Sequence, residues 1–319
     1  MKTLFALLLI GFSVNSNSQS WPNKPIRWVV PYTGGGITDI VTRVVTQKMQ
    51  AGLGQPIVVD NKPGANSLIG ADLVAKSAPD GYSIVTVIAA HAANATLYQG
   101  KMPFDPVKSF IPFSLAAIAP LILTTNNNFP ARDMKELIAY AKANPGKVNF
   151  GSSGIGAAAH LTTELLKQTA GIDMVHVPFK GTAPALLAEQ ANDIQILVDV
   201  PSTLMTHVRG GKIKALAMFS KNRIPGAQEV PTMAEAGGPP IEASTWVMFL
   251  APARTPAEIV SRLSIEAHKA VNDPEIRTRF NDIGIEAVGG NPAQTSKFLA
   301  DEIAKWAKVI NTAGVKAEQ

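Results

Sequence analysis

Two glycine-rich stretches of the sequence hold the residues best suited to bind an anion. "VVPYTGGGITD" (29–39) and "VNFGSSGIGAAAH" (148–160) each read as the end of a strand, a glycine loop and the start of a helix. The first backbone N–H groups of a helix have no partner within it and carry a partial positive charge, so each loop can hold an anion. Glycine lets a ligand approach the backbone closely because it has no Cβ atom. Hydroxyl groups stand beside the glycines at Thr33, Thr38, Ser152 and Ser153.

A glycine loop has an alternative explanation, because tight turns and helix caps need glycine without any ligand. Two polar loops of the same plan, one in each half of the chain, favour anion binding over this alternative. Asp39, in the first loop, would stand in the first turn of a helix, where the helix dipole stabilises a carboxylate. It would repel an anionic ligand unless a water molecule or a backbone donor lay between them.

Three further residues stand at the ends of apolar runs or within one. His91 follows the run "SIVTVIA" (83–89) and could reach the same cleft, or it could cap or pack a helix. Asp199 falls at the end of "IQILVDV" (194–200), where an unpaired buried carboxylate would be costly, so we expect hydrogen-bond donors beside it. Asp199 would then orient the site. Trp246 lies on another apolar run and could pack in a core or face the ligand.

The second loop invites comparison with a catalytic serine, but the match is incomplete. "GSSGI" (151–155) departs from the nucleophile motif G-x-S-x-G at its last position, Ile155. His160 would lie about two turns into the following helix, and no acid partner is evident. The five histidines show no metal-ligand spacing, cysteine is absent, and no dinucleotide or P-loop motif occurs. We therefore expect no enzyme activity, metal or cofactor, with a secreted serine hydrolase using Ser152 or Ser153 as the alternative.

Apolar runs typical of strands alternate with helical patterns through most of the chain. The expected strands lie at 26–32, 56–60, 83–89, 147–153, 174–179, 194–200 and 213–219. The expected helices include 40–53, 67–77, 134–144, 157–170 and 183–192. The segment from about Ala257 to Asn311 is expected to be wholly helical. Strands rich in β-branched residues and separated by helices indicate parallel sheets with helices on both faces.

The order of these elements predicts an α/β fold of two doubly wound domains. Two long extended runs, 110–126 and 244–253, are expected to be strands that cross between the domains. We place residues 21–122 and 247–319 in the first domain and residues 123–246 in the second. Two crossings give a hinge over a central cleft, and ligands of open α/β sheets bind at the carboxyl ends of the strands.

The first twenty residues have the pattern of a cleaved signal peptide. Lys2 precedes an apolar stretch from Leu4 to about Phe12, and small polar residues lead to a cleavage site before Trp21. The apolar stretch is too short to span a bilayer, so we expect export to a bacterial periplasm. The formal net charge of +5 is spread along the chain and aromatic residues make up only 6%, which argues against a nucleic-acid partner. A mild positive charge fits an anionic small molecule, although ordinary solvated surface charge explains it as well.

Four stretches together resemble the periplasmic solute-binding receptors of tripartite tricarboxylate transporters. They are "WPNKPIRWVVPYTGGGITDIVTR" (21–43), "LGQPIVVDNKPGANSLIGADLVAKSAPDGYSIV" (53–85), "FGSSGIGAAAHLTTELLK" (150–167) and "VPFKGTAPALLAEQANDIQILVD" (177–199). The similarity runs through essentially the whole mature chain, and "NKPGA…IGA…VAKSAPDGY" is its specific signature. The resemblance implies a fold like that of type II periplasmic binding proteins, whose two domains close on a carboxylated ligand. It also implies the membrane subunits of a transporter as partners.

The two binding loops of that family map onto residues 33–39 and 152–160, and ordered waters commonly bridge the ligand carboxylate to the first loop. With the residues identified above, the candidate ligand-binding residues are Thr33, Gly35, Gly36, Ile37, Thr38, Asp39, His91, Ser152, Ser153, Gly154, Ala157, His160, Asp199 and Trp246.

The sequence departs from the family pattern at apolar positions. Ile37 stands where many relatives carry a small residue, and Val247 and Met248 stand where a small or polar pair is frequent. Together with Trp246 they would make the pocket less polar if they faced it. We therefore expect a preference for dicarboxylates with an apolar or aromatic body, such as terephthalate, over citrate. The alternative is that these side chains pack into the domain cores and say nothing about the ligand.

Overall fold

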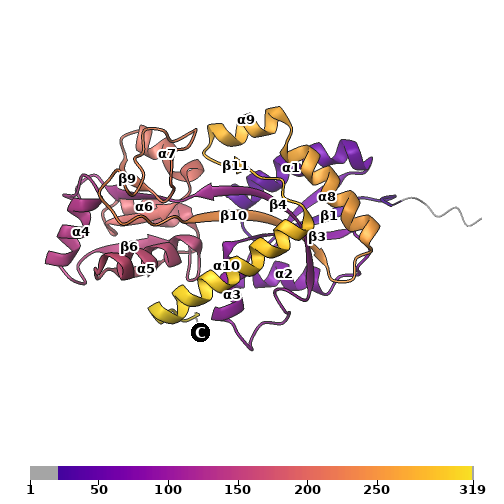
Figure 1. Ribbon diagram of the computed structural model, residues 1–319, viewed down its shortest axis with the longest axis horizontal. Helices are drawn as coiled ribbons and strands as arrows, with labels where there is room; N and C mark the ends of the chain where they lie inside the picture. Colours follow the sequence, from indigo (N-terminus) through magenta and orange to yellow (C-terminus); the bar gives the residue numbers. More distant parts are fainter. Residues whose placement is uncertain (1–20, 318–319) are drawn as a thin grey trace, which may run out of the picture.

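The computed structural model describes residues 21–317, so the expected signal peptide at residues 1–20 lies outside the described residues. The strands form two separate sheets, each flanked by helices, and two long strands run from one sheet towards the other (Figure 1). This arrangement confirms the predicted α/β fold with two sheet-based units joined by crossing strands.

The first sheet has the strand order β11-β4-β10-β3-β1-β2. Its strands are β1 (Ile26–Val30), β2 (Ile57–Asn61), β3 (Ser83–Ile88), β4 (Phe110–Pro120), β10 (Ser244–Pro252) and β11 (Glu286–Ala287). Helices cover both of its faces (Figure 1). On one side are α1 (Ile37–Leu53) and α8 (Ala257–Val271), and on the other are α2 (Leu68–Ala75), α3 (Ala89–Leu97) and α10 (Pro292–Ala313).

The second sheet has the order β7-β6-β8-β5-β9. Its strands are β5 (Ile122–Asn126), β6 (Asn149–Ser152), β7 (Val175–Pro178), β8 (Ile196–Asp199) and β9 (Ile213–Met218). The helices around it are α4 (Met134–Ala143), α5 (Ala158–Ala170), α6 (Thr182–Gln190) and α7 (Pro201–Arg209). The short helices α3 and α7 were not among the expected elements. Helix α3 follows directly on the buried strand β3 with no polar break between them, and α7 begins two residues after the end of β8.

Both sheets are mixed, whereas the sequence pattern predicted parallel sheets. Strands β1, β2 and β3 are parallel, as are β6, β7 and β8. The crossing strand β10 runs antiparallel to β3 and β4, and β5 runs antiparallel to β8 and β9. The cause is the two crossings, because a chain that leaves the first sheet on one strand must return to it on a strand of opposite direction.

The C-terminal segment was expected to be wholly helical, but the structure shows that it is not. Helices α8, α9 (Pro274–Asp282) and α10 are separated by turns, and the two residues of β11 pair with β4. The breaks follow from residues that end or start helices. Proline occupies the first helical position at Pro274 and Pro292, and Gly284 and Gly289 adopt φ values of +74° and +66°.

The change from one sheet to the other falls close to the expected domain boundaries. Strand β4 ends at Pro120 and β5 begins at Ile122, so the first crossing takes place at Leu121. The return runs between Met218 and Ser244, where β10 begins. The domain limits at 122/123 and 246/247 stay a prediction.

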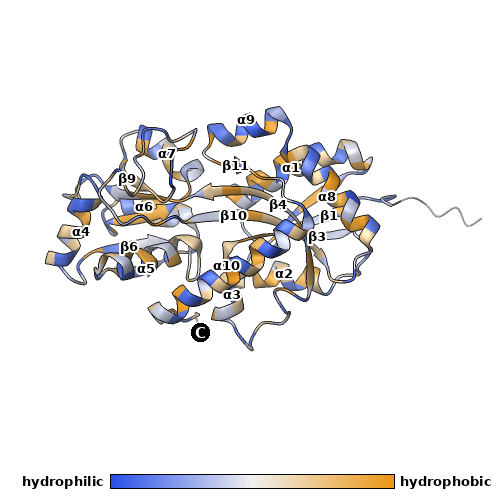
Figure 2. Ribbon diagram, viewed as in Figure 1, coloured by the Kyte–Doolittle hydropathy of each residue, from blue (hydrophilic) through white to orange (hydrophobic). Residues whose placement is uncertain are grey.

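Helix α10 is fastened to the crossing strand β10 by a buried polar contact. The indole N–H groups of Trp246 on β10 and Trp306 on α10 both donate to Oε2 of Glu302, at 2.9 Å each. Both tryptophans are fully buried. Hydrophobic and hydrophilic residues alternate along α10 (Figure 2). Its buried residues include Leu299, Trp306 and Ile310. The carboxylate of Glu302 thus provides the acceptor that two buried donors need.

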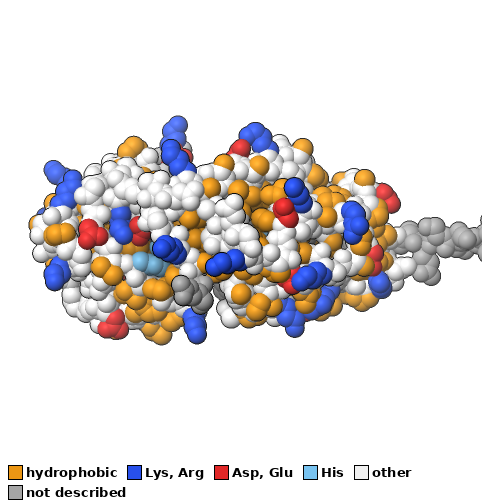
Figure 3. Space-filling model, turned by 90° about the horizontal axis from the view of Figure 1, so that it is seen from below, with side chains coloured by type: hydrophobic (Ala, Val, Ile, Leu, Met, Phe, Trp, Pro, Cys, Tyr) orange, Lys and Arg blue, Asp and Glu red, His pale blue; other side chains and the backbone are white. Residues whose placement is uncertain are grey.

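Basic side chains are scattered over the visible face of the molecule and do not gather in one patch (Figure 3). In residues 21–317, no helix has the length and apolar character needed to cross a membrane.

We expect Glu302→Leu to lower the free energy of unfolding by about 2–4 kcal/mol, because two buried indole N–H groups would lose their acceptor. Glu302→Gln retains an acceptor oxygen of the same reach and should cost about 1 kcal/mol. Urea unfolding followed by tryptophan fluorescence measures both variants. Equal losses in the two variants would contradict the assigned role of the carboxylate oxygen.

Candidate functional site

A cavity of about 530 Å³ lies between the two sheets. Its wall contains residues that follow or end strands of both sheets, among them Thr33, Ile88, Ser153, Lys180 and Asp199. These positions are the carboxyl ends of strands, where ligands of open α/β sheets bind. The crossing strands contribute Leu121 and Thr245 to the wall. The cavity therefore has contributions from both sheets and from the strands that join them.

Five helices begin at this cavity, and none of them has a side-chain cap. The helices are α1, α3 and α5–α7, and their N-cap residues, all of which line the cavity, are Gly36, Ile88, Ala157, Gly181 and Val200. An N-cap side chain would accept the free N–H groups of the first turn and compete with a ligand. Without one, these donors and the positive ends of the helix dipoles remain available to an anion.

Three of the helices that begin elsewhere have side-chain caps. Asp133, Asp273 and Asn291 cap α4, α9 and α10 with side-chain oxygens. Helices α2 and α8, whose N-cap residues are Ser67 and Pro256, have no side-chain cap. Absence of a cap alone therefore does not identify a binding site, and the distinguishing feature is the convergence of five such helix starts on one cavity.

The first loop is shaped by Asp39, which does not line the cavity. Its carboxylate accepts hydrogen bonds from the Gly35 N–H at 3.1 Å, from Asn61 Nδ2 at 3.0 Å and from Arg43 Nε at 3.0 Å. Burial opposes ionisation of Asp39, but these hydrogen bonds outweigh it and lower the pKa of the carboxyl group. The predicted residues that do line the cavity are Thr33, Gly35, Gly36, Ile37 and Thr38.

The second loop contributes Ser153 and Ala157 to the wall, whereas Ser152, Gly154 and His160 lie behind it. Ser152 is fully buried. Its hydroxyl lies 3.0 Å from the carbonyl oxygen of Gly154 and 2.7 Å from His176 Nε2. The Gly154 N–H also donates to this hydroxyl at 3.3 Å, so its single proton goes either to the Gly154 carbonyl or to His176 Nε2, according to the histidine tautomer. Ser152 does not line the cavity, so a substrate held there would not meet the Ser152–His176 pair that a serine hydrolase would use.

Two stacked histidines support this loop from inside the protein. The rings of His160 and His176 are 3.7 Å apart at their centroids, and His160 Nδ1 accepts the Gly156 N–H at 3.1 Å. Burial is the main cause that lowers the pKa of His160 to about 3 and of His176 to about 4. Both rings are therefore neutral near pH 7, and His160 can accept the loop's hydrogen bond.

His91 lies away from the cavity, contrary to the prediction. Its Nε2 lies 2.8 Å from the carbonyl oxygen of Pro106, and its ring stacks on Phe104. It is 1% exposed, and burial lowers its pKa to about 4. As a residue of α3 its side chain points to the 104–110 segment, because the helix starts at Ala89 and turns the third residue away from the cleft.

Trp246 also lies in the core of the first sheet, as do Val247 and Met248, all three with no exposed surface. Neighbouring residues on a strand face opposite sides, so Thr245 lines the cavity and Trp246 points to Glu302. The expectation that these three side chains form apolar walls of the pocket was wrong. Ile37 lines the cavity as expected.

Asp199 lines the cavity with both carboxylate oxygens engaged. Oδ2 accepts from the Thr182 hydroxyl at 2.6 Å and Oδ1 from the Val200 N–H at 2.7 Å, so the expected donors are present. Burial raises the pKa of Asp199, and the two hydrogen bonds partly oppose the rise. The carboxyl group links the starts of α6 and α7.

The sequence reading missed several polar residues in the wall. Among the residues that line the cavity in the described chain, Lys180 is the only lysine or arginine, and no carboxylate pairs with it there. It precedes α6 in "PFKGT", a strand–loop–helix junction of the same plan as the two glycine loops. Asn66 and His207 also line the cavity, as does Ser202, whose buried hydroxyl has no hydrogen-bond partner in the protein.

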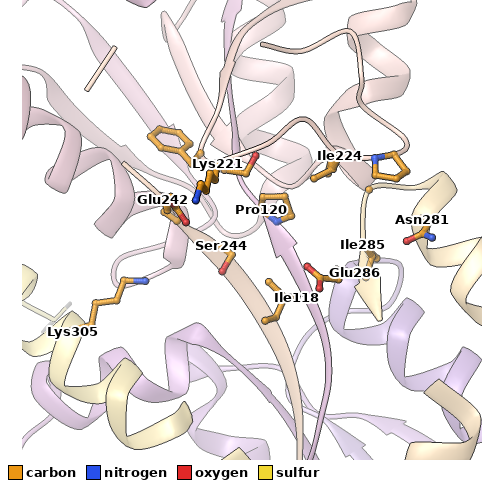
Figure 4. A pocket seen from close by; sticks show the side chains of 15 residues that line it. Ile118, Pro120, Lys221, Ile224, Glu242, Ser244, Asn281, Ile285, Glu286 and Lys305 are labelled. Carbon is orange, nitrogen blue, oxygen red and sulfur yellow. The ribbon is translucent and has the colours of Figure 1, made fainter. Parts of the chain in front are cut away.

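A second cavity of about 460 Å³ lies on the other side of the crossing strands (Figure 4). Pro120 and Ser244 line it, whereas their neighbours Leu121 and Thr245 line the first cavity. Figure 4 shows side chains of both signs around it, from Lys221, Glu242, Glu286 and Lys305. No helix begins at its wall, and two carboxylates stand there, so the first cavity is the better anion site. No cluster of metal-ligating side chains occurs within residues 21–317.

Comparison with known proteins shows what this chain is similar to. Residues 41–315 match the tripartite tricarboxylate transporter family receptor, TctC. Protein BugT of Bordetella pertussis is 34% identical, with 96% of this chain and 94% of BugT covered.

Two solved structures have the same fold and a ligand named with them. The structure of R. palustris Rpa4515 with adipate is 33% identical with a TM-score of 0.87, covering 93% of this chain and 99% of that one. MatC from Rhodopseudomonas palustris with bound malate is 31% identical with a TM-score of 0.81, covering 91% and 100%.

We predict that stability falls as the pH drops from about 6.5 towards 4.5. In that range the unfolded chain takes up protons on histidines that stay neutral when folded, since the pKa values of His91, His160 and His176 are lowered to about 4, 3 and 4. His176→Phe keeps a stacking ring and removes one of these groups, so its stability should fall less steeply with pH. Urea unfolding at several pH values measures the slope. An unchanged slope in the variant would refute the assignment, whatever its stability at pH 7.5.

Proposed function

Because the chain belongs to the family of tripartite tricarboxylate transporter receptors, we propose that it is a periplasmic receptor that captures a small organic carboxylate between its two sheets and delivers it to the membrane subunits of such a transporter. The observation that carries the proposal is the convergence of five uncapped helix starts, from both sheets, on one cavity. The carboxylates named with the related structures, adipate and malate, support the chemical class of the ligand.

The physical basis is the match between a carboxylate and backbone donors. A carboxylate oxygen accepts N–H groups at short distance, and a hydrogen bond to a charged group is worth roughly 1.5–3 kcal/mol net. The hydroxyls of Thr33, Thr38 and Ser153 stand in the same wall and can add further donors. One carboxylate group can thus be held without an arginine, since the helix starts supply both donors and partial positive charge.

The cavity favours a ligand with a carboxylate at each end. The first loop belongs to the first sheet, whereas Lys180 and the start of α6 belong to the second, so two anionic ends can be held from opposite sides. The wall also carries apolar side chains, namely Ile37, Ile88, Leu121, Leu186 and Val200. We infer a preference for dicarboxylates with an apolar or aromatic body, such as terephthalate, over citrate. A rigid body loses little conformational freedom on binding, whereas citrate's hydroxyl and third carboxylate add groups whose desolvation must be compensated.

The receptor is inferred to bind without changing its ligand. Ser152 is fully buried and does not line the cavity, so it does not reach a ligand held there. Ser153 lines the cavity, but no histidine is hydrogen-bonded to its hydroxyl in the described chain. A hydrolase needs a base within hydrogen-bond reach of its serine.

Delivery requires that the transporter distinguish loaded from empty receptor. We propose that the crossing strands β4–β5 and β10 form the hinge, with residues 1–20 acting as the cleaved signal for export. A ligand held by both sheets favours their closed arrangement, because only differential affinity for that arrangement can drive closure.

We predict that terephthalate and adipate bind more tightly than citrate or benzoate. Lys180→Gln should weaken the binding of the two dicarboxylates about tenfold, because it removes the positive charge that faces one end of the ligand. Benzoate has one carboxylate and should lose little affinity in this variant. Lys221→Gln, which changes a lysine beside the second cavity, is the matched control and should bind all four acids as the wild type does. Isothermal titration calorimetry measures the affinities.

Tight citrate binding without any dicarboxylate preference would contradict the proposed apolar, two-ended site. Equal weakening by Lys180→Gln and Lys221→Gln would show a general effect of net charge and not a contact at one end of the ligand.

A second prediction separates binding from catalysis. Ser153→Ala should weaken carboxylate binding about threefold to tenfold, through loss of one hydrogen bond, with little change in melting temperature. Chromatography of a dicarboxylate and of an ester such as 4-nitrophenyl acetate, each incubated with the wild-type protein, should show no product above the buffer rate. Ester turnover that Ser153→Ala or Ser152→Ala abolishes would favour the hydrolase instead.

A further inference from the structure

The segment between β2 and α2 has a backbone conformation that needs external support. Gly64, Ala65, Asn66 and Ser67 have φ values of +132°, +45°, +49° and +75° in succession. Positive φ is unfavourable for residues with a Cβ atom, and asparagine tolerates it better than most. Three such residues in a row are held only where the surroundings fix them. The contacts of Asn66 show what does so here.

Asn66 forms a reciprocal pair with Asn94, a fully buried residue of α3. Asn94 Nδ2 donates to the Asn66 carbonyl at 2.8 Å, which leaves Asn94 Oδ1 to accept from Asn66 Nδ2, also at 2.8 Å. The backbone carbonyl at one end can only accept, so the orientation of both amides is determined. The pair anchors the strained segment to the first sheet's helices.

The second N–H of the Asn66 side-chain amide forms a hydrogen bond to the other half of the molecule. Asn66 Nδ2 donates to the carbonyl oxygen of Ile155 at 3.3 Å. Ile155 belongs to the second glycine loop, two residues after Ser153, and both Asn66 and Ser153 line the cavity. One side chain thus spans from the first sheet's segment to the loop that presents donors from the second sheet.

The adjoining contact leaves no room for a side chain on the loop. A Cβ atom at Gly156, which has a φ of +78°, would lie 2.3 Å from Leu97 Cδ1 and 3.5 Å from Asn66 Nδ2. Leu97 ends α3, so the glycine loop of the second sheet is seated directly against that helix. Glycine at position 156 permits the approach that the hydrogen bond from Asn66 requires.

We propose that Asn66 is a closure latch, a positioning residue that holds the second glycine loop against the first sheet's helices when the two sheets close around the cavity. The inference rests on the proposed function, because closure around a ligand is its premise. The bond to Ile155 can form only when the two halves are this close, so it stabilises the closed arrangement selectively. A contact made in one of two states shifts the population towards that state, and ligand affinity rises with the closed fraction.

Two variants test the latch. Asn66→Gly removes the amide but accommodates the φ of +49° without strain, so the segment keeps its conformation. Asn66→Asp keeps the shape and puts a carboxylate oxygen against the carbonyl of Ile155. The matched control is Asn127→Ala, because Asn127 Nδ2 also donates to a backbone carbonyl, that of Gly211 at 2.8 Å, but within one half of the molecule.

The chain has no cysteine, so Lys101→Cys and Lys142→Cys, both on exposed residues, allow a fluorophore pair to be placed on the two halves. Single-molecule energy transfer then gives the closed fraction without ligand and with adipate or terephthalate. Both Asn66 variants should lower the ratio of closed to open molecules about twofold to tenfold, as expected for one hydrogen bond, and Asn127→Ala should not. The affinity for the dicarboxylates should fall by a similar factor.

Closed fractions equal to the wild type in both Asn66 variants would overturn the latch, and so would an equal fall in Asn127→Ala. If no carboxylate binds the wild type, the proposed function fails, but the ligand-free closed fractions still decide whether Asn66 holds the two halves together.

Discussion

The structure depends on a set of helix starts that the protein leaves without side-chain caps. Helices α1 and α3 begin on the first sheet and α5, α6 and α7 on the second, and all five starts face one cavity without a side-chain cap. The first N–H groups of a helix have no partner within it, so these starts can donate to water or to an anion in the cavity. A single small anion can accept from donors of both sheets only while the two sets of helix starts face each other. The two sheets are joined by the crossing strands β4–β5 and β10.

The side chains that shape the loops do so without placing an unpaired negative charge in the wall. Asp39 is ionised but turned inward, where Arg43, Asn61 and the Gly35 N–H surround it. Asp199 does face the cavity, yet both of its oxygens accept hydrogen bonds from residues at the starts of α6 and α7. The stacked histidines behind the second loop are neutral because burial lowers their pKa values. A carboxylate ligand therefore meets donors and not a competing anion.

Much of the fold could be predicted from the sequence, because β-branched runs and 3.6-residue periodicity report which residues are buried within each element. The two glycine loops were recognisable for the same reason, since each lies between a buried strand and an amphipathic helix. Side-chain direction was harder to predict. Thr245 and Trp246 are neighbours on one strand, yet Thr245 faces the cavity and Trp246 faces Glu302. A sequence pattern that does not give the strand's register cannot show which of the two faces the cavity. Lys180 stands at a third strand–loop–helix junction that lacks a run of glycines. Asparagine tolerates the left-handed conformation, but its residue type alone does not show that Asn66 adopts it.

The crossing strands couple the two sides of the molecule through the alternation of their side chains. Leu121 and Thr245 face the cavity with the helix starts, whereas Pro120 and Ser244 face the second cavity behind it. Each crossing strand therefore contributes to the walls of both cavities. Contacts between the halves exist on both sides. Asn66 meets Ile155 at the front, and at the rear Gly226 lies so close to the turn after α9 that a Cβ atom there would be 2.6 Å from the Gly284 nitrogen. If the crossing strands act as the proposed hinge, both of these contacts must change when the two sheets move apart.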